Sequence, residues 1–136
     1  MSANLVSLGP EIEKFLDDKG ITGETYNFEK FSEKAPDKAT VINAGTQAGE
    51  LPFEIPIDAQ RIEFVVRDEH PREALTRALA ICNVIHGAVP GRLHPTSDLD
   101  LLGAFIDERP QRTDNEDLDL AEQTFSAVFR VKKRSN

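Results

Sequence analysis

The stretch IEFVVRDEHPREALTRALAICNVIHG, residues 62–87, decides the fold. At its start Ile62, Phe64 and Val66 alternate with mainly charged residues, a period of two that is typical of a half-buried strand. After Pro71 the spacing of the apolar residues changes to three and four, which indicates an amphipathic helix. Pro71 fits the first helical position, because a backbone N–H is not needed there. A strand followed by such a helix predicts a sheet with a helix lying across it.

The predicted helix should bury one stripe and leave its other residues in water. We expect the buried stripe to consist of Leu75, Ala78, Leu79, Cys82, Ile85 and His86. The charged side chains of Arg72, Glu73 and Arg77 are expected in solvent. Gly87 is expected to end the helix, since glycine tolerates a positive φ.

Other segments predict one more helix and several strands. Apolar spacing favours a helix over residues 9–19 that ends at Gly20. Its buried face should hold Leu5, Leu8, Ile12, Phe15 and Leu16. Short strands are expected around Tyr26 and Phe28 and at ATVIN, residues 39–43.

The remaining segments are less regular. Residues 45–58 contain two glycines and two prolines and predict a loop or a hairpin tip, although their apolar residues alternate. Residues 99–110 predict a strand, with a kink at Gly103 as an alternative. Residues 111–120 predict an acidic loop, and residues 122–136 predict a long terminal strand with a basic end.

This order predicts an α+β fold: a mixed or antiparallel sheet, with an N-terminal helix and a long central helix packed on one face. The 136 residues fit one domain, 1–136. The net charge of −8 and the pI of about 4.9 disfavour non-specific nucleic-acid binding by the whole surface. No apolar run approaches the roughly 20 residues of a membrane span. The single cysteine excludes an internal disulfide and fits assembly in a reducing cytoplasm.

Candidate chemical sites are few. Cys82 and His86 lie four residues apart on the predicted helix and could ligate a metal together, but no second ligand pair accompanies them. His70 is a candidate general base with Asp68 and Glu69 nearby, and the alternative is that these residues only begin the helix. The sequence contains no G-x-S-x-G, phosphate-loop or calcium-loop motif. It therefore predicts no catalytic residue, no metal and no cofactor.

Four stretches, taken in order, match the pattern of one protein family. They are EIEKFLDDKG, KATVINAGTQAGELP, the opening stretch, and FIDERPQRTDNEDLDLAEQTFSAVFRV. The opening stretch is the most specific, with Arg67 at the end of its strand, Glu-Ala near the start of its helix and His-Gly at its close. Over most of its length the chain resembles the tail terminator, or tail completion, proteins of long-tailed bacteriophages and related gene-transfer particles.

The resemblance implies a structural role in the virion, at the junction of head and tail. Such proteins form a homomeric ring, usually a hexamer, on the last ring of the tail tube. The ring ends tube growth and offers a surface to the head-completion or connector protein, and genomic DNA passes through its lumen without sequence-specific binding. The resemblance implies no reaction, no cofactor and no membrane.

Two loops and the terminal strand are the expected contacts with neighbouring subunits. The loop 45–58 is apolar, the loop 107–120 is long, and the edge of the terminal strand could pair with another copy. The candidate interface residues are Leu51, Phe53, Ile55, Ile57, Asp107, Glu108, Arg109, Arg112, Arg130, Lys132 and Lys133. The basic end, 130–134, could touch phosphate or an acidic partner, or could simply protect a strand edge.

Three other functions stay open at the level of sequence. One is another ring of the same neck, such as a head-completion or tail-tube protein. The second is a small cytoplasmic enzyme or ligand-binding domain that uses Arg67, Asp68 and His70. The third is a partner-binding adaptor, which the acidic composition would also suit.

Overall fold

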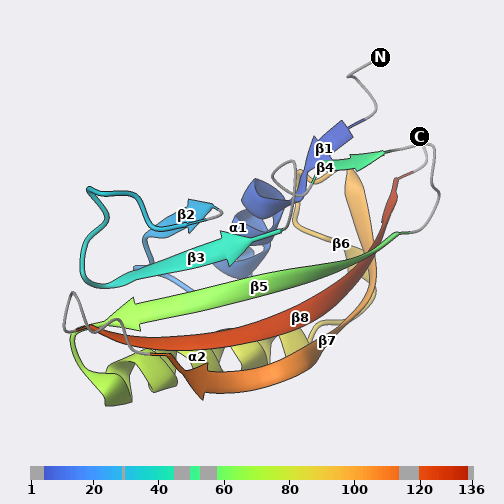
Figure 1. The fold of residues 1–136 in the computed structure, drawn as a ribbon. Coiled ribbons are helices and arrows are strands. Elements are labelled where there is room, and N and C mark those ends of the chain that lie inside the picture. The colour runs from blue at the N-terminus through green and yellow to red at the C-terminus, as the bar shows by residue number, and fades with distance from the viewer. Residues whose placement is uncertain (1–4, 29, 45–49, 53–57, 114–119, 135–136) are drawn as a thin grey trace.

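The structure is a computed structural model that describes residues 5–28, 30–44, 50–52, 58–113 and 120–134. It has the predicted α+β fold, with two helices and a mixed sheet (Figure 1). The elements are β1 (Leu5–Ser7), α1 (Leu8–Asp18), β2 (Tyr26–Phe28), β3 (Ala39–Asn43), β4 (Glu50–Pro52), β5 (Asp58–Asp68), α2 (Pro71–His86), β6 (Gly91–Arg92), β7 (Leu99–Arg112) and β8 (Ala121–Lys133).

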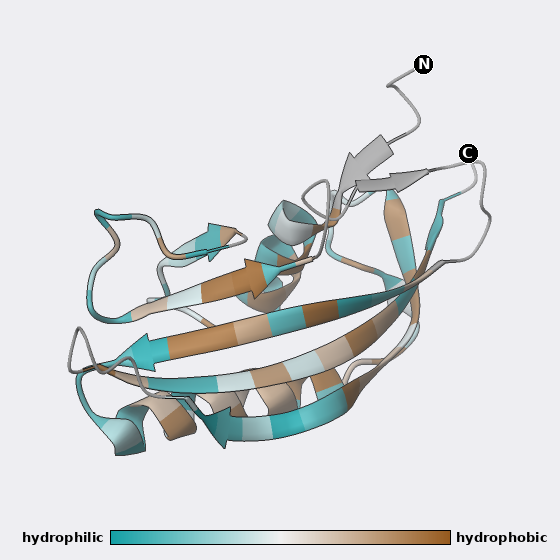
Figure 2. Ribbon diagram, viewed as in Figure 1, coloured by the Kyte–Doolittle hydropathy of each residue, from teal (hydrophilic) through white to brown (hydrophobic). Residues whose placement is uncertain are grey.

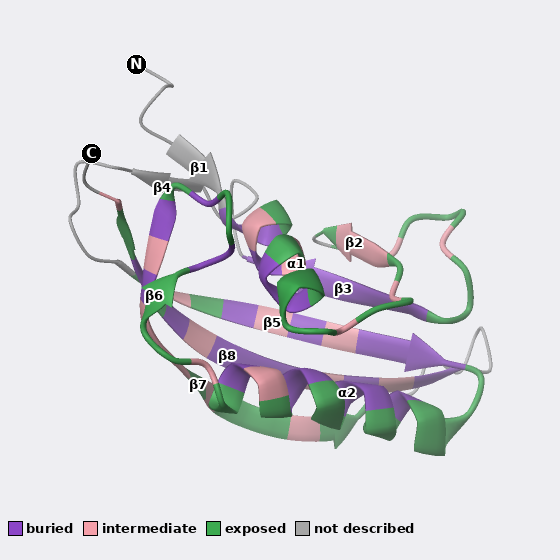
Figure 3. Ribbon diagram, turned by 180° about the vertical axis from the view of Figure 1, so that it is seen from behind, coloured by how far each residue is buried: buried purple, intermediate pink, exposed green. Residues whose placement is uncertain are grey.

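The main sheet has six strands in the order β2-β3-β5-β8-β7-β6. β2 and β3 are parallel, and every other neighbouring pair is antiparallel. Both described helices lie on one face of this sheet, as predicted, and no described helix covers the opposite face (Figures 1 and 3). β1 and β4 form a separate antiparallel pair that stands away from the main sheet, at the end far from α2.

The core lies between the sheet and the helices, and the strands β3, β5 and β8 carry hydrophobic segments (brown in Figure 2). Phe64 of β5 stacks on Phe125 of β8 with ring centroids 4.8 Å apart. Phe15 of α1 meets Phe129 of β8 edge to face at 5.9 Å. Burial of such side chains contributes about 1.5–3 kcal/mol each. No helix in the described part of the chain is long and apolar enough to cross a membrane.

The prediction for α1 is confirmed except for Leu5, which was expected on the buried face of this helix and instead lies in β1, before the helix begins. Ile12, Phe15 and Leu16 are buried together, as the apolar spacing predicted. Gly20 has φ +96°, and the N–H of Ile21 donates to the carbonyl of Leu16 at 3.0 Å. This left-handed cap satisfies carbonyls that the last helical turn leaves without partners.

The helix α2 is present, but its predicted buried stripe is partly wrong. Ala78, Cys82 and Ile85 are buried as expected, whereas His86 is exposed and Leu75 and Leu79 are 40% and 44% exposed. The face against the sheet instead consists of Ala74, Arg77, Ala78, Ile81, Cys82 and Ile85. Two stripes with helical spacing run side by side on this helix, and the prediction merged them. Gly87 does follow the helix, but its φ is −87°, so no left-handed conformation ends α2.

Two further predictions about the second half of the chain are wrong. The strand expected over residues 99–110 is confirmed and continues to Arg112 as β7. Residues 107–112 therefore do not belong to the expected contact loop 107–120, because they continue the ladder with β8. β8 is not an edge strand: it lies between β5 and β7 and pairs with both. A register shift between Leu101 and Gly103 marks the irregularity that was anticipated at Gly103.

Candidate interaction surfaces

Arg77 is the centre of a buried polar cluster that joins α2 to the sheet. The side chain is 9% exposed, although the sequence predicted it in water. Its Nε donates to Glu24 Oε2 at 2.8 Å and its Nη2 to Glu24 Oε1 at 2.5 Å, a bidentate pair. Its Nη1 donates to the carbonyl of Arg67 at 2.7 Å and to Asp68 Oδ2 at 3.1 Å. Thr40 of β3 completes the cluster by donating its hydroxyl to Glu24 at 2.8 Å.

The charges of this cluster stabilise one another. Burial alone would raise the pKa of Glu24, but the hydrogen bonds from Arg77 and Thr40 and the charge of Arg77 outweigh burial and lower it. Burial alone would lower the pKa of Arg77, and its bonds to Glu24 and Asp68 raise it. The cluster therefore holds the segment before β2, together with β3, β5 and α2, in fixed relation, which is a structural role.

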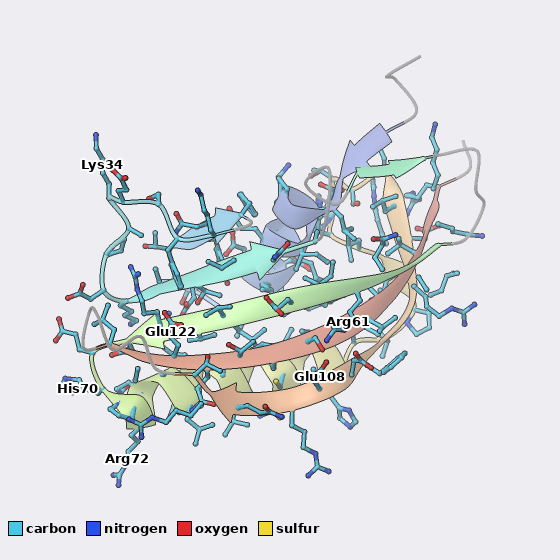
Figure 4. The ribbon with its side chains drawn as sticks, viewed as in Figure 1. Lys34, Arg61, His70, Arg72, Glu108 and Glu122 are labelled. Carbon is cyan, nitrogen blue, oxygen red and sulfur yellow. The ribbon has the colours of Figure 1, made fainter. Side chains whose placement is uncertain are left out.

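The three residues of the small-enzyme alternative are held by structural bonds or face solvent. Arg67 Nη2 donates to the carbonyl of Pro36 at 2.7 Å, and its guanidinium lies 4.0 Å from the ring centroid of Phe31. Asp68 accepts the backbone N–H of His70 at 3.1 Å while it is bound to Arg77. The imidazole of His70 is exposed at the start of α2 (Figure 4). This arrangement matches the reading in which the residues begin the helix.

Cys82 and His86 do not form a metal site with other described residues. Cys82 is buried against the sheet, and burial raises the pKa of its thiol to about 11. A thiol with so little thiolate is a poor ligand and a poor nucleophile. Within the described residues, no three His, Cys, Asp or Glu side chains are grouped closely enough to hold a metal ion.

Another buried cluster, which the sequence did not reveal, lies where the loop after β6 meets α1. His94 Nε2 lies 2.9 Å from Glu11 Oε2, and the hydroxyl of Ser97 donates to Glu11 Oε1 at 2.6 Å. The same hydroxyl accepts the backbone N–H of Leu99 at 3.0 Å. Because Ser97 bonds to the carboxylate and not to the histidine, the geometry is not that of a base-activated nucleophile. The cluster ties the loop to the first turn of α1, and the 83 residues between His94 and Glu11 explain why no local motif predicts it.

The predicted interface residues Asp107 and Glu108 lie on the helix-free face of the sheet. Arg61 of β5 reaches across β8 and bonds to both: its Nε donates to Asp107 Oδ2 at 2.8 Å, and its Nη2 to Glu108 (Figure 4). The Arg61 side chain is 51% exposed, so water screens these pairs. Arg112 is also exposed on β7, opposite Gln123.

An apolar groove lies on the other side of β7, against α2. We call it the α2–β7 groove and define it by Leu75, Leu79, Cys82, Asn83, His86, Ile106, Arg109 and Pro110. Its volume is about 400 Å³. Leu75, Leu79, Cys82 and His86 follow helical spacing, so the second stripe of α2 lines the groove, and Figure 3 shows both exposed and buried residues along this helix. Of the predicted interface residues, Arg109 is the one that lies here.

The basic end of β8 is exposed beside an acidic partner strand. Lys132 pairs in register with Asp100 of β7, and Arg134 Nη1 donates to Asp100 Oδ1 at 3.2 Å. Arg130 is exposed one step further in, opposite Gly103, and Lys133 is exposed at the strand end. These side chains give one end of the sheet a positive patch on a protein whose net charge is −8.

The predicted apolar loop lies mostly outside the described residues. Phe53, Ile55 and Ile57 belong to that part, and nothing in the structure tests their exposure. Leu51 falls in β4, whose backbone pairs with Val6 of β1. The alternation that begins at Leu51 thus starts in a strand that is set apart from the main sheet.

The chain was compared with known protein families, curated proteins and solved structures. No family model matches the sequence, and no curated protein matches it. The chain is similar in structure to a chain of a solved particle described as "Virion of native gene transfer agent (GTA) particle". The TM-score is 0.58, the sequence identity is 15%, and the match covers 96% of this chain and 96% of the other. At this identity the likeness shows that the two chains share one fold over nearly their whole lengths.

Proposed function

We propose that this chain is a structural protein of a phage-like particle, and specifically a tail terminator. Six or so copies form a ring on the last ring of the tail tube, end its growth and present a surface to the head-completion or connector protein. The observation that carries the proposal is the fold likeness to a virion chain, which spans 96% of both proteins. The sequence resemblance to tail terminators points to the same class of particle.

The surfaces of the described residues support an assembly role. The polar clusters around Arg77 and Glu11 are satisfied internally and hold the fold together. The α2–β7 groove and the basic end of β8 lie on the surface at different places on the sheet. A ring built from heterologous contacts needs two unlike patches on each subunit.

The acidic composition supports passage of DNA through the ring. With a net charge of −8, a ring of several copies carries a large negative charge, which repels phosphates and disfavours adhesion of DNA to the lumen. The chain as one domain, 1–136, would form one segment of the wall, with the strand and helix of residues 62–87 as its scaffold.

The direct test of the terminator role is the length of tail tubes. Tube protein from the same particle is allowed to polymerise with and without this protein, and tube lengths are measured by negative-stain microscopy. We expect added protein to shorten the tubes and to leave density at one end. Tubes of unchanged length with no bound protein would contradict the terminator function. Density along the whole tube would instead indicate a tube protein.

A further inference from the structure

The α2–β7 groove has the properties of a docking site for an extended chain. Leu75 and Leu79 are 40% and 44% exposed on its floor, which is unusual for large apolar residues that lie side by side. β7 pairs with β8 along one edge, and along its other edge β6 pairs only with Asp100 and Leu101 among the described strands. The edge of β7 beyond Leu101 thus runs beside the groove without a described partner strand, and an added strand could pair with it.

The chain itself contains a segment whose pattern fits this site. Leu51, Phe53, Ile55 and Ile57, the apolar row, alternate with polar residues and prolines. In an extended chain, alternate residues share a face and direct their N–H and C=O groups to the same edge. The apolar row would therefore present one apolar face and one edge with every N–H present. Pro52 and Pro56 fall on the opposite edge, where a missing N–H prevents pairing.

The two surfaces are complementary in charge. The segment 50–58 contains Glu50, Glu54 and Asp58 and no basic residue. Among the residues that the structure describes, the groove is lined by one charged residue, Arg109, and by no acidic residue. The net charge of the protein is −8, so most of its surface repels an acidic segment. An apolar groove with a positive charge therefore favours binding of an acidic, apolar segment.

Within one subunit, the described strands on either side of the segment lie away from the groove. β5, which follows the segment, begins at Asp58 opposite Val131 of β8. The residues that β7 contributes to the groove lie toward the other end of β8, since Ile106 pairs with Ala127 and Gln111 with Thr124. Figure 1 places the β1–β4 pair, whose strand β4 precedes the segment, at the end of the molecule far from α2. We therefore place the contact between two copies, head to tail, an arrangement that generates a ring when the rotation closes.

We propose that residues 53–57 of one copy dock in the α2–β7 groove of the next copy, as an added strand on the edge of β7 with Phe53 and Ile55 over Leu79. This inference rests on the proposed ring and names the contact that builds it. The occupant is a second copy of this chain, and the contact is heterologous.

A mixed disulfide trap tests the contact. Two proteins are made in a Cys82→Ser background, one with Leu79→Cys and one with Ile55→Cys, and they are oxidised with glutathione alone and as a mixture. We expect disulfide-linked pairs in the mixture and none in either protein alone. The matched control replaces Leu79→Cys by Ala80→Cys, an exposed position of the same helix that does not line the groove. A docked pair reacts at its effective concentration, so the Leu79 pair should form at least about tenfold faster than the Ala80 pair.

Equal rates for the Leu79 and Ala80 pairs, or absence of both products, would overturn the inference. Self-linked Leu79→Cys pairs would also overturn it, because they indicate a two-fold contact between the grooves. A second measurement separates the docking contact from the ring. Leu79→Asp should raise the concentration for half-maximal assembly by at least about tenfold, and Ala80→Asp should not. If rings still form with Leu79→Asp, the docking contact is wrong and the proposed ring function stands. If disulfide-linked pairs form but never close into rings, the contact is right and the proposed ring is wrong.

Discussion

The two stripes of α2 differ in burial, and their composition alone does not predict this difference. The inner stripe is built from small and medium side chains around Arg77, and it is buried with its charges paired. The outer stripe holds the apolar residues Leu75 and Leu79, and it faces a groove that no described element fills. A helical period in the sequence therefore indicates that an apolar stripe exists. The elements packed against the helix determine whether that stripe belongs to the core or forms a contact surface.

The largest effect is expected at the charge of the inner stripe. Arg77→Leu leaves Glu24 and Asp68 buried without their cation, and we expect it to lower the free energy of unfolding by about 3–5 kcal/mol. Urea denaturation measures the loss. Arg72→Leu, on the exposed face of the same helix, is the control and should change little. A loss of unfolding free energy below about 1 kcal/mol would show that the Arg77 cluster does not hold these elements together.

The next effect separates the two apolar stripes directly. Ile81 is fully buried, so Ile81→Ala should cost about 2–5 kcal/mol through lost transfer energy and a cavity. Leu79→Ala removes as many methyl groups from the outer stripe and should cost less than about 1 kcal/mol in the monomer. The two variants are compared in urea at a protein concentration where only monomer is present. Equal losses would mean that the outer stripe is part of the core.

The acid response of Glu24 is a smaller and more specific effect. Because its folded pKa is lowered from 4.5, its contribution is fully present above that pH and is lost as pH falls toward the folded pKa. In that window the unfolded chain binds the proton first, and stability should fall by up to about 1.4 kcal/mol per pH unit. Glu24→Gln should remove this part of the slope, and Glu73→Gln on exposed α2 controls for the change in charge. The same slope in both variants would contradict the assignment.

The smallest effect is expected at the exposed counterpart of Arg77. Arg61 also bonds two carboxylates, Asp107 and Glu108, but on the open face of the sheet. Solvent screens these pairs, so Arg61→Gln should leave the urea midpoint unchanged within error. A shift in the urea midpoint comparable to that of Arg77→Leu would show that burial does not make the Arg77 cluster more important for stability than the Arg61 cluster.

The sequence predicted where the helices and strands lie better than it predicted which elements pack or pair with one another. Period-two and helical spacing located β3, β5, α1 and α2, because those patterns are local. The position of β8 between β5 and β7 depends on long-range pairing, and the terminal strand gives no local sign of it. Arg77 was assigned to water from its charge alone, although it lies three residues after Ala74 and four before Ile81, on the inner stripe. The partners that bury it, Glu24 and Thr40, are more than 35 residues away in the sequence.

The candidate interface was only partly accessible to the same reasoning. Alternation drew attention to Phe53 and Ile55, while the groove that we propose for them combines α2 with β7 and exists only in the folded chain. Arg109 was selected as part of a loop and lies in a strand beside the groove.

The most direct measurement is the mass of the protein in solution, by light scattering over a range of concentrations, with negative-stain images of the same samples. The account predicts growth from monomer to a closed, hollow ring of about six copies, consistent with heterologous contacts that close. A compact dimer that stays the same size at every concentration and never forms rings would contradict it.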